Sequence, residues 1–469
     1  MMQRSIRNSF YSLGGSPGQQ FNKVRSHLRT PLYRNGYALL VTAVATSLLG
    51  IIFWAAAVRF YPPDVVGFSS ATISAMVLVT GLASFSLQGV LVRFLPAAGA
   101  QAGRLILLAY AIHASMALLL GALFVHTVAL WAPNLSALSA GGAAGWGFVL
   151  GAVVWSMFNL QDGALTGLRH AVWVPVENIL YAVGKMVLLV LLANGMPHWG
   201  IFAAWVIPAA AAIIPINLLL LRRLVPQAAK VHSPQIRAAD RASIARYIVR
   251  NYPGALFSLA LSSLMPLVVS QQAGLRANAY FYMPWMIYTG LQLVPINLAT
   301  SMTVEAVHDE RKLGLFSYRV LVQSLRLLGP VVAALLLGAH WLLLAFGPEY
   351  AAQGETLVRL LALAAIPNIL VVLYISVLRV ENRGWNLVLV QAAQAVLLLG
   401  LSYWLLPLWG ITGVGVAALA SQTFVAAAFV LGRMAPVLRR GRAEHLSGKT
   451  NGGVHGERSL APAPGGKVQ

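Results

Sequence analysis

Cysteine is absent from this chain of 469 residues, and acidic residues are few. The absence of cysteine excludes structural disulfides and thiolate metal sites. Only 12 residues are Asp or Glu against 33 Lys and Arg, and charged residues together make up 10% of the chain. A sequence that is 58% hydrophobic and so poor in charge is typical of a polytopic membrane protein. The bilayer then explains the positive charge, which in a soluble protein would suggest nucleic acid.

Motifs for enzymatic chemistry are also missing. The ten histidines are scattered, and the sequence contains no HExxH, CxxC or GxxxxGK[ST] pattern. We therefore expect no enzyme, no cofactor and no metal site. Energy for transport would come from an ion gradient, the membrane potential or a substrate gradient, and the sequence does not choose among them.

Twelve apolar segments are long enough to cross about 30 Å of hydrocarbon as helices. They predict an all-α polytopic membrane protein with six helices in each half. The segments cover residues 36–58, 67–92, 105–130, 142–165, 172–193, 200–221, 252–273, 280–304, 320–345, 357–378, 387–408 and 412–431.

The two halves repeat one another. PHWGIF at residues 197–202 returns as PLWGIT at 407–412, and Leu168-Arg169 returns as Leu378-Arg379. Because each half has an even number of helices, both halves enter the membrane from the same side. The repeats are therefore predicted to be parallel, related by a pseudo-two-fold axis along the membrane normal, as in transporters built from two bundles around a central site.

Basic residues fix the orientation of the helices. If the N-terminus is inside, 29 of the 33 Lys and Arg fall in inner segments, and the positive-inside bias then places both termini in the cytoplasm. The predicted parts are a basic cytoplasmic tail (1–33), an N-lobe (34–221), a basic cytoplasmic linker (222–250), a C-lobe (251–432) and a disordered cytoplasmic tail (433–469).

Two further predictions concern the cytoplasmic segments. The spacing of Ile236, Ile244, Tyr247 and Ile248 predicts a short amphipathic helix in the linker, lying on the inner leaflet. The basic tails either rest on anionic lipid heads or only orient the chain.

Connections on the outer side are very short. Segments 59–66, 131–141, 194–199 and 409–410 are too small for a soluble domain or an acceptor-binding lid. This disfavours a membrane-embedded glycosyltransferase or polysaccharide polymerase, which needs sizeable outer loops.

Lys185 is the one charge that falls near the middle of a predicted span, and such residues are costly in a membrane. Asn178, Tyr181 and Lys185 follow helical spacing on one face. This polar stripe is predicted to face a central cavity, where the ammonium would hold a phosphate or pyrophosphate. The alternative is a structural ion pair with a carboxylate of another helix.

Asp162 and Glu177 flank Arg169 in the chain, so both are expected one to two turns from the inner surface. Two carboxylates at similar depth could carry protons and so act in gating or ion coupling. They could equally neutralise Arg93, Arg169 or Arg379 near the same surface.

An aromatic stripe with an amide occurs in the eighth segment, at Phe281, Trp285, Tyr288 and Gln292. Such side chains can stack on sugars and hydrogen-bond them, but Trp and Tyr also collect at the membrane interface. Only Tyr288 and Gln292 are deep enough to be candidate substrate contacts.

At residues 158–178 the segment FNLQDGALTGLRHAVWVPVEN, with Lys185 downstream, resembles the fourth-to-fifth helix region of bacterial polysaccharide-biosynthesis flippases. These belong to the multidrug/oligosaccharidyl-lipid/polysaccharide (MOP) exporter superfamily. Supporting matches are RNGYALLVTAVATSLLG (34–50), FYPPDVVGFSSA (60–71), LVRFLP (91–96), SMTVEAVHDERKL (301–313), FGPEY (346–350) and LPLWGITGVGVAAL (406–419). The resemblance runs over about residues 34–431.

The resemblance implies a two-lobed, MATE-like fold in the bacterial inner membrane. It implies a flippase that moves undecaprenyl-pyrophosphate-linked oligosaccharide to the outer leaflet by alternating access, for O-antigen, capsule or exopolysaccharide. Its partners would be this lipid-linked glycan, membrane lipids, and the polymerase and glycosyltransferases of the same pathway. Lys185 would then contact the pyrophosphate, and Arg93, Asp162, Arg169, Glu177 and Asn178 would line or gate the inner mouth.

Two other hypotheses stay open. A multidrug or organic-cation antiporter of the same fold would need a buried carboxylate at mid-depth, where this chain has Lys185. The membrane-embedded polymerase or glycosyltransferase is the third.

Overall fold

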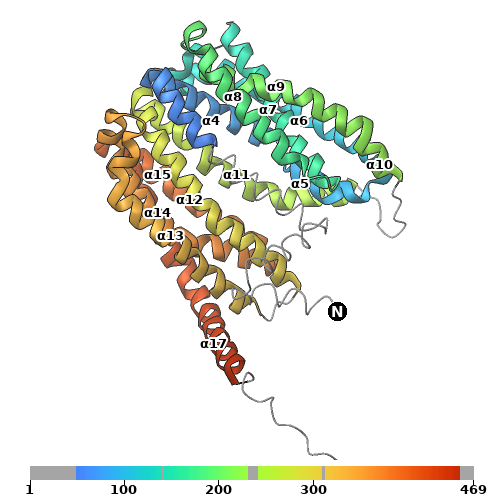
Figure 1. Cartoon of the computed structure of the whole chain (residues 1–469), viewed down its shortest axis with the longest axis vertical. Coiled ribbons are helices and arrows are strands. Elements are labelled where there is room, and N and C mark those ends of the chain that lie inside the picture. Colours follow the sequence, from blue (N-terminus) through green and yellow to red (C-terminus); the bar gives the residue numbers. More distant parts are fainter. Residues whose placement is uncertain (1–48, 140–141, 231–240, 309–311, 455–469) are drawn as a thin grey trace, which may run out of the picture. The chain divides into compact units, whose positions relative to one another are not determined.

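Helices make up the fold, and the part of the chain described by the computed structural model (residues 49–139, 142–230, 241–308 and 312–454) contains no strand. The helices are an apolar one over Leu49–Phe60, then α4 (Pro63–Ala83), α5 (Leu87–Phe94), α6 (Ala102–Trp131), α7 (Ala143–Gly167), α8 (Trp173–Gly195), α9 (Gly200–Leu219), α10 (Val225–Lys230), α11 (Arg241–Gln272), α12 (Leu275–His308), α13 (Leu313–Leu344), α14 (Pro348–Val380), α15 (Gly384–Trp409), α16 (Ile411–Val425) and α17 (Gly432–Val454) (Figure 1). Ten of these helices are long and apolar enough to cross a membrane; the helix over Leu49–Phe60, α5, α10, α12 and α17 are not among these ten.

The predicted segments agree well with these helices. From the third segment onward, each coincides with one long helix, and short π-helical stretches at Leu220–Leu224 and Ala426–Leu431 prolong α9 and α16. Most of the first segment, 36–58, lies outside the described residues, and the helix over Leu49–Phe60 covers its end. Apolar length was therefore a sufficient guide to most of the spans.

The prediction of a single helix over the second segment, 67–92, is wrong. The structure divides it into α4 and α5 at a turn, where Phe85 and Ser86 have φ angles of 44° and 56°. The left-handed region is uncommon for residues other than glycine, and two such residues in succession end a right-handed helix. The Ser84 hydroxyl also donates to the carbonyl of Gly81 at 2.7 Å, a side-chain bond that competes with the helical pattern.

The linker and the C-terminal segment also differ from expectation. Residues 241–250 do not form a separate helix, because they are the first turns of α11; Ile236 lies outside the described residues. The C-terminal segment, for which composition predicts disorder, is helical in α17 as far as Val454. α17 packs on α13, where a Cβ built on Gly441 would lie 2.0 Å from the carbonyl oxygen of Gly314. This close backbone approach gives the helix a partner that composition does not reveal.

The chain forms two compact units. Unit 1 contains the described residues up to Phe60, Val79–Thr127 and Leu138–Val249; unit 2 contains Tyr61–Leu78, Val128–Ala137 and the described residues from Arg250 onward. Unit 2 thus includes two pieces from the first half of the sequence, namely α4 as far as Leu78 and the end of α6 from Val128. The lobes expected from the repeat, 34–221 and 251–432, stay a prediction.

In unit 2, α14 is the central helix. It packs against α12 and α13 (Figure 1). It also packs against α16, on which α15 packs. Its buried face includes Leu361, Ala365 and Ile369, which recur at helical spacing. α12, α13 and α16 therefore pack around the apolar surface of α14.

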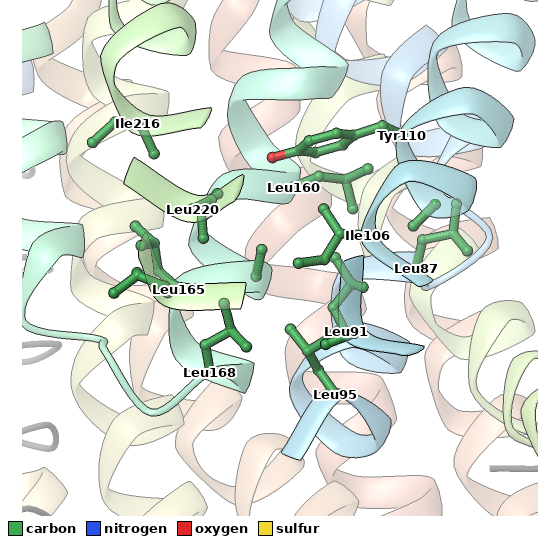
Figure 2. Packing of buried hydrophobic residues seen from close by; sticks show 14 of the residues in the cluster. Leu87, Leu91, Leu95, Ile106, Tyr110, Leu160, Leu165, Leu168, Ile216 and Leu220 are labelled. Atoms are coloured by element: carbon green, nitrogen blue, oxygen red, sulfur yellow. The ribbon is translucent and has the colours of Figure 1, made fainter. Parts of the chain in front are cut away.

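In unit 1, a cluster of buried apolar side chains joins α5, α6, α7 and the end of α9. Figure 2 shows Leu91 of α5 and Leu95, which directly follows α5, directed toward Ile106 of α6, and Tyr110 of α6 lying over Leu160 of α7. A Cβ on Gly167 would lie 2.6 Å from the carbonyl oxygen of Leu91, so the backbones of α5 and α7 are in direct contact. This packing fixes the end of α7 that carries Asp162.

Leu91→Ala is expected to destabilise unit 1 by about 2–5 kcal/mol, because it leaves a cavity in this cluster. Leu91 is fully buried, whereas Leu107 on α6 is 53% exposed. We expect a clear fall in the melting temperature of the detergent-solubilised protein for Leu91→Ala and little change for Leu107→Ala. Equal melting temperatures for the two variants would contradict the role of the cluster.

Candidate functional site

Lys185 lies near the middle of α8 and is 5% exposed. Its Nζ atom lies 4.1 Å from the centroid of the Trp205 ring, 4.8 Å from that of Phe53 and 5.2 Å from that of Tyr181. A cation over an aromatic face gains up to about 2 kcal/mol when it is desolvated. Three rings from three helices thus form a cage around the ammonium, which we call the lysine cage.

More aromatic rings surround the lysine cage. The Trp155 ring lies 5.9 Å from both Tyr181 and Trp205, and Phe158 lies 4.9 Å from Tyr181. Sequence reasoning found Lys185 and Tyr181, because they lie one turn apart on one helix. It missed Phe53, Trp155 and Trp205, since aromatic residues in apolar spans look like ordinary core and only the fold brings them together.

Within the described residues, Lys185 has no ion pair. Ion pairs that the structure does form include Arg276–Glu349, Arg359–Glu355, His340–Glu355 and Arg383–Glu381, and none of these involves Lys185. The alternative that Lys185 is neutralised by a carboxylate of another helix therefore has no support in this part of the chain. Contacts with rings alone do not neutralise an ammonium group.

Asp162 and Glu177 form a second polar cluster in unit 1. The Asn178 amide donates to Asp162 at 3.2 Å and to the carbonyl oxygen of Val174 at 3.0 Å. Glu177 is 2% exposed, and neither of its carboxylate oxygens has a hydrogen-bond partner among the described residues. Asp162 and Glu177 interact electrostatically with each other and with the hydroxyl of Tyr110.

The residues of the predicted polar stripe of α8 divide between two groups of contacts. Tyr181 and Lys185 belong to the lysine cage, whereas Asn178 bonds Asp162 of α7. The carboxylates do not neutralise Arg93, whose guanidinium carbon lies 5.4 Å from the centroid of the Tyr247 ring and 5.7 Å from that of Phe94. A buried carboxylate without a donor is costly unless it is protonated or binds a cation.

Arg93 and Arg169 lie at helix ends rather than in the lysine cage. Arg93 is exposed near the end of α5. Arg169 is exposed in the turn between α7 and α8, with a φ angle of 63°. Neither contacts the lysine cage, which leaves them as candidates for the mouth of a passage.

Tyr288 and Gln292 lie in unit 2, on α12. The Tyr288 hydroxyl accepts a long hydrogen bond, 3.5 Å, from the Gln422 amide, and Gln292 is near enough to interact with the same hydroxyl. The Gln394 amide donates to Gln422 at 3.0 Å. The sequence did not predict Gln394 of α15 and Gln422 of α16 as site residues. Together with the predicted pair, Tyr288 and Gln292, they form a larger uncharged polar network.

No protein-family model matches this sequence, and no curated protein is similar to it in sequence. Solved structures do match. A MATE structure in the straight conformation has a TM-score of 0.59 at 17% identity, and the match covers 90% of this chain and 98% of that chain. The inward-facing conformation of a multidrug resistance MATE family transporter of the MOP superfamily has a TM-score of 0.55 at 18% identity, with the same coverage.

The lipid II flippase MurJ, in an inward closed conformation, matches with a TM-score of 0.59 at 9% identity, over 86% of this chain and 91% of that chain. These similar proteins are transporters and a flippase rather than enzymes. The predicted fold class is confirmed. The chain therefore has the all-helical fold that the MATE transporters and the MurJ flippase of the MOP superfamily share.

Proposed function

We propose that this protein is a flippase that moves undecaprenyl-pyrophosphate-linked oligosaccharide across the bacterial cytoplasmic membrane by alternating access. The observation that carries the proposal is Lys185, a buried ammonium near mid-span that has no carboxylate partner in the described residues. The transported glycan would serve surface polysaccharide assembly, together with a polymerase and glycosyltransferases. Both termini would be cytoplasmic, as the distribution of basic residues predicts.

The chemistry of the cargo supports this role for Lys185. An isoprenoid chain can stay in the bilayer during flipping, so the costly step is passage of the pyrophosphate through a region of low dielectric. An ammonium that is held only by rings can exchange those rings for phosphate oxygens and form charge-assisted hydrogen bonds. These hydrogen bonds would offset the unfavourable free energy of burying the Lys185 charge while the cargo passes.

The remaining predicted residues would serve other parts of the cycle. Asp162 and Glu177 would couple transport to protons or small cations, since Glu177 is buried without a donor. Arg93 and Arg169 would attract the anionic head group at the inner mouth. Tyr288 and Gln292 would contact sugars, because aromatic rings and amides suit hydroxyl-rich cargo. Asn178 would position Asp162.

A second candidate is an antiporter of organic cations. It is favoured by the same buried carboxylates and by the aromatic rings of unit 1, which suit a desolvated cation. It is disfavoured by Lys185, whose charge would repel such cargo. An embedded polymerase or glycosyltransferase has no comparable support.

Transport by the full chain in vesicles separates these candidates. One arm measures how fast a fluorescent undecaprenyl-pyrophosphate-linked glycan becomes accessible in the opposite leaflet; the other measures uptake of a fluorescent organic cation. We expect glycan flipping well above protein-free vesicles and no cation uptake. Cation uptake without glycan flipping would overturn the proposal in favour of the antiporter.

A further inference from the structure

Asn278 of α12 is fully buried and joins two helices from different halves of the sequence. Its side-chain amide donates to the carbonyl oxygen of Gly67 at 2.9 Å and to the hydroxyl of Ser70 at 3.0 Å. Gly67 and Ser70 lie in the first turns of α4, within the stretch Tyr61–Leu78 that belongs to unit 2 together with α12. The contact is thus part of one compact unit.

The backbones of the two helices also touch at this point. A Cβ built on Gly67 would lie 1.7 Å from the carbonyl oxygen of Leu275 and 3.2 Å from the backbone nitrogen of Ala279. Since a carbonyl of a helix backbone cannot retract as a side chain can, only glycine fits here. The close approach places Asn278 within reach of α4.

A second set of hydrogen bonds also joins the two halves of the sequence. Asn134, which follows α6, donates from its side chain to the carbonyl oxygen of Ser270 at 2.6 Å, and its backbone N–H donates to the Gln271 side chain at 3.2 Å. Ser270 and Gln271 lie at the end of α11. By the predicted orientation, the starts of α4 and α12 and the ends of α6 and α11 all lie on the outer side.

We propose that Asn278, with Gly67 and Ser70, is a latch that closes the outer side of the transporter and opens once in each transport cycle. The inference rests on the proposed function, because alternating access requires the halves to separate on the outer side. The contacts suit a reversible closure. They are neutral hydrogen bonds and backbone packing without an ion pair, so each contributes little and can be remade. Asn278 and Gly67 are therefore assigned to gating rather than to cargo binding.

Cross-linking tests the latch directly, because the chain has no cysteine of its own. The variant Ser70→Cys/Asn278→Cys, treated with a short bis-methanethiosulfonate, is expected to lose glycan flipping at least tenfold and to recover it on reduction. The matched control is His340→Cys/Glu355→Cys, which joins α13 to α14 within the second half. It is expected to keep its transport after the same treatment. Undiminished flipping with the Ser70–Asn278 cross-link in place would overturn the latch.

A second measurement does not depend on the cargo. In Ser70→Cys, the added Gly67→Ala is expected to raise labelling by a membrane-impermeant maleimide from the outer side several-fold, because the new methyl group prevents closure. Alanine is compatible with the helix itself. If glycan flipping fails but labelling rises, the latch stands and the proposed cargo does not. Labelling that Gly67→Ala leaves unchanged would remove the latch whatever the cargo is.

Discussion

Lys185→Met is expected to slow flipping of the lipid-linked glycan by about tenfold to a hundredfold, the loss that follows from removing one charge-assisted hydrogen bond. Methionine has a similar length and fills the lysine cage, so the change removes the charge with little change in packing. The measurement is the initial flipping rate in vesicles at equal protein content. Lys185→Arg, which keeps the positive charge, is expected to retain more of the rate than Lys185→Met.

Stability separates a functional role of Lys185 from a structural one. Burying an ammonium costs free energy that rings repay only in part, so Lys185→Met is expected to melt at the same temperature as the unaltered protein or higher. Leu189→Met, one turn further on the same buried face, is the matched control and is expected to flip normally. A lower melting temperature together with lost flipping would identify Lys185 as a structural residue.

Glu177→Gln is expected to abolish the response of transport to an imposed ion gradient. Glutamine is close in shape to a protonated glutamate but cannot release a proton or bind a cation as a carboxylate does. Cargo would still exchange between the leaflets, but a proton or sodium gradient would no longer change its distribution. The fraction of labelled glycan in the outer leaflet, measured with and without each gradient, reports this directly.

The control for this prediction lies in the other unit. Glu355→Gln removes a carboxylate that is already paired with Arg359 and His340, so the gradient response is expected to persist. Asp162→Asn is expected to weaken the response, because Asp162 is the acidic neighbour of Glu177. A gradient response that survives in Glu177→Gln would show that coupling takes place elsewhere.

Much of the fold could be predicted from the sequence, because apolar length and basic residues depend on the bilayer rather than on tertiary contacts. The predicted spans from residue 105 onward coincide with observed helices. Lys185 could also be predicted as a site residue, because a charged residue within an apolar span is recognisable from a single sequence.

Features that arise from packing could not be predicted. The turn at Phe85 and Ser86 interrupts an apolar segment without a glycine or proline at those positions. The lysine cage combines Phe53, Tyr181 and Trp205 from three helices, and no spacing in the sequence links them.

The contacts between Asn278 and α4 were equally hidden, since they join residues 208 and 211 positions apart. Their detection requires the folded chain.

Binding of the charged head group tests the central claim most directly. The measurement compares the shift in melting temperature of the purified protein on adding undecaprenyl pyrophosphate with the shift on adding undecaprenol, which has the same chain without charge. We expect the pyrophosphate to stabilise the protein more than the alcohol does, and Lys185→Met to remove most of that difference. Equal stabilisation by the two lipids, or a difference that persists in Lys185→Met, would contradict the account.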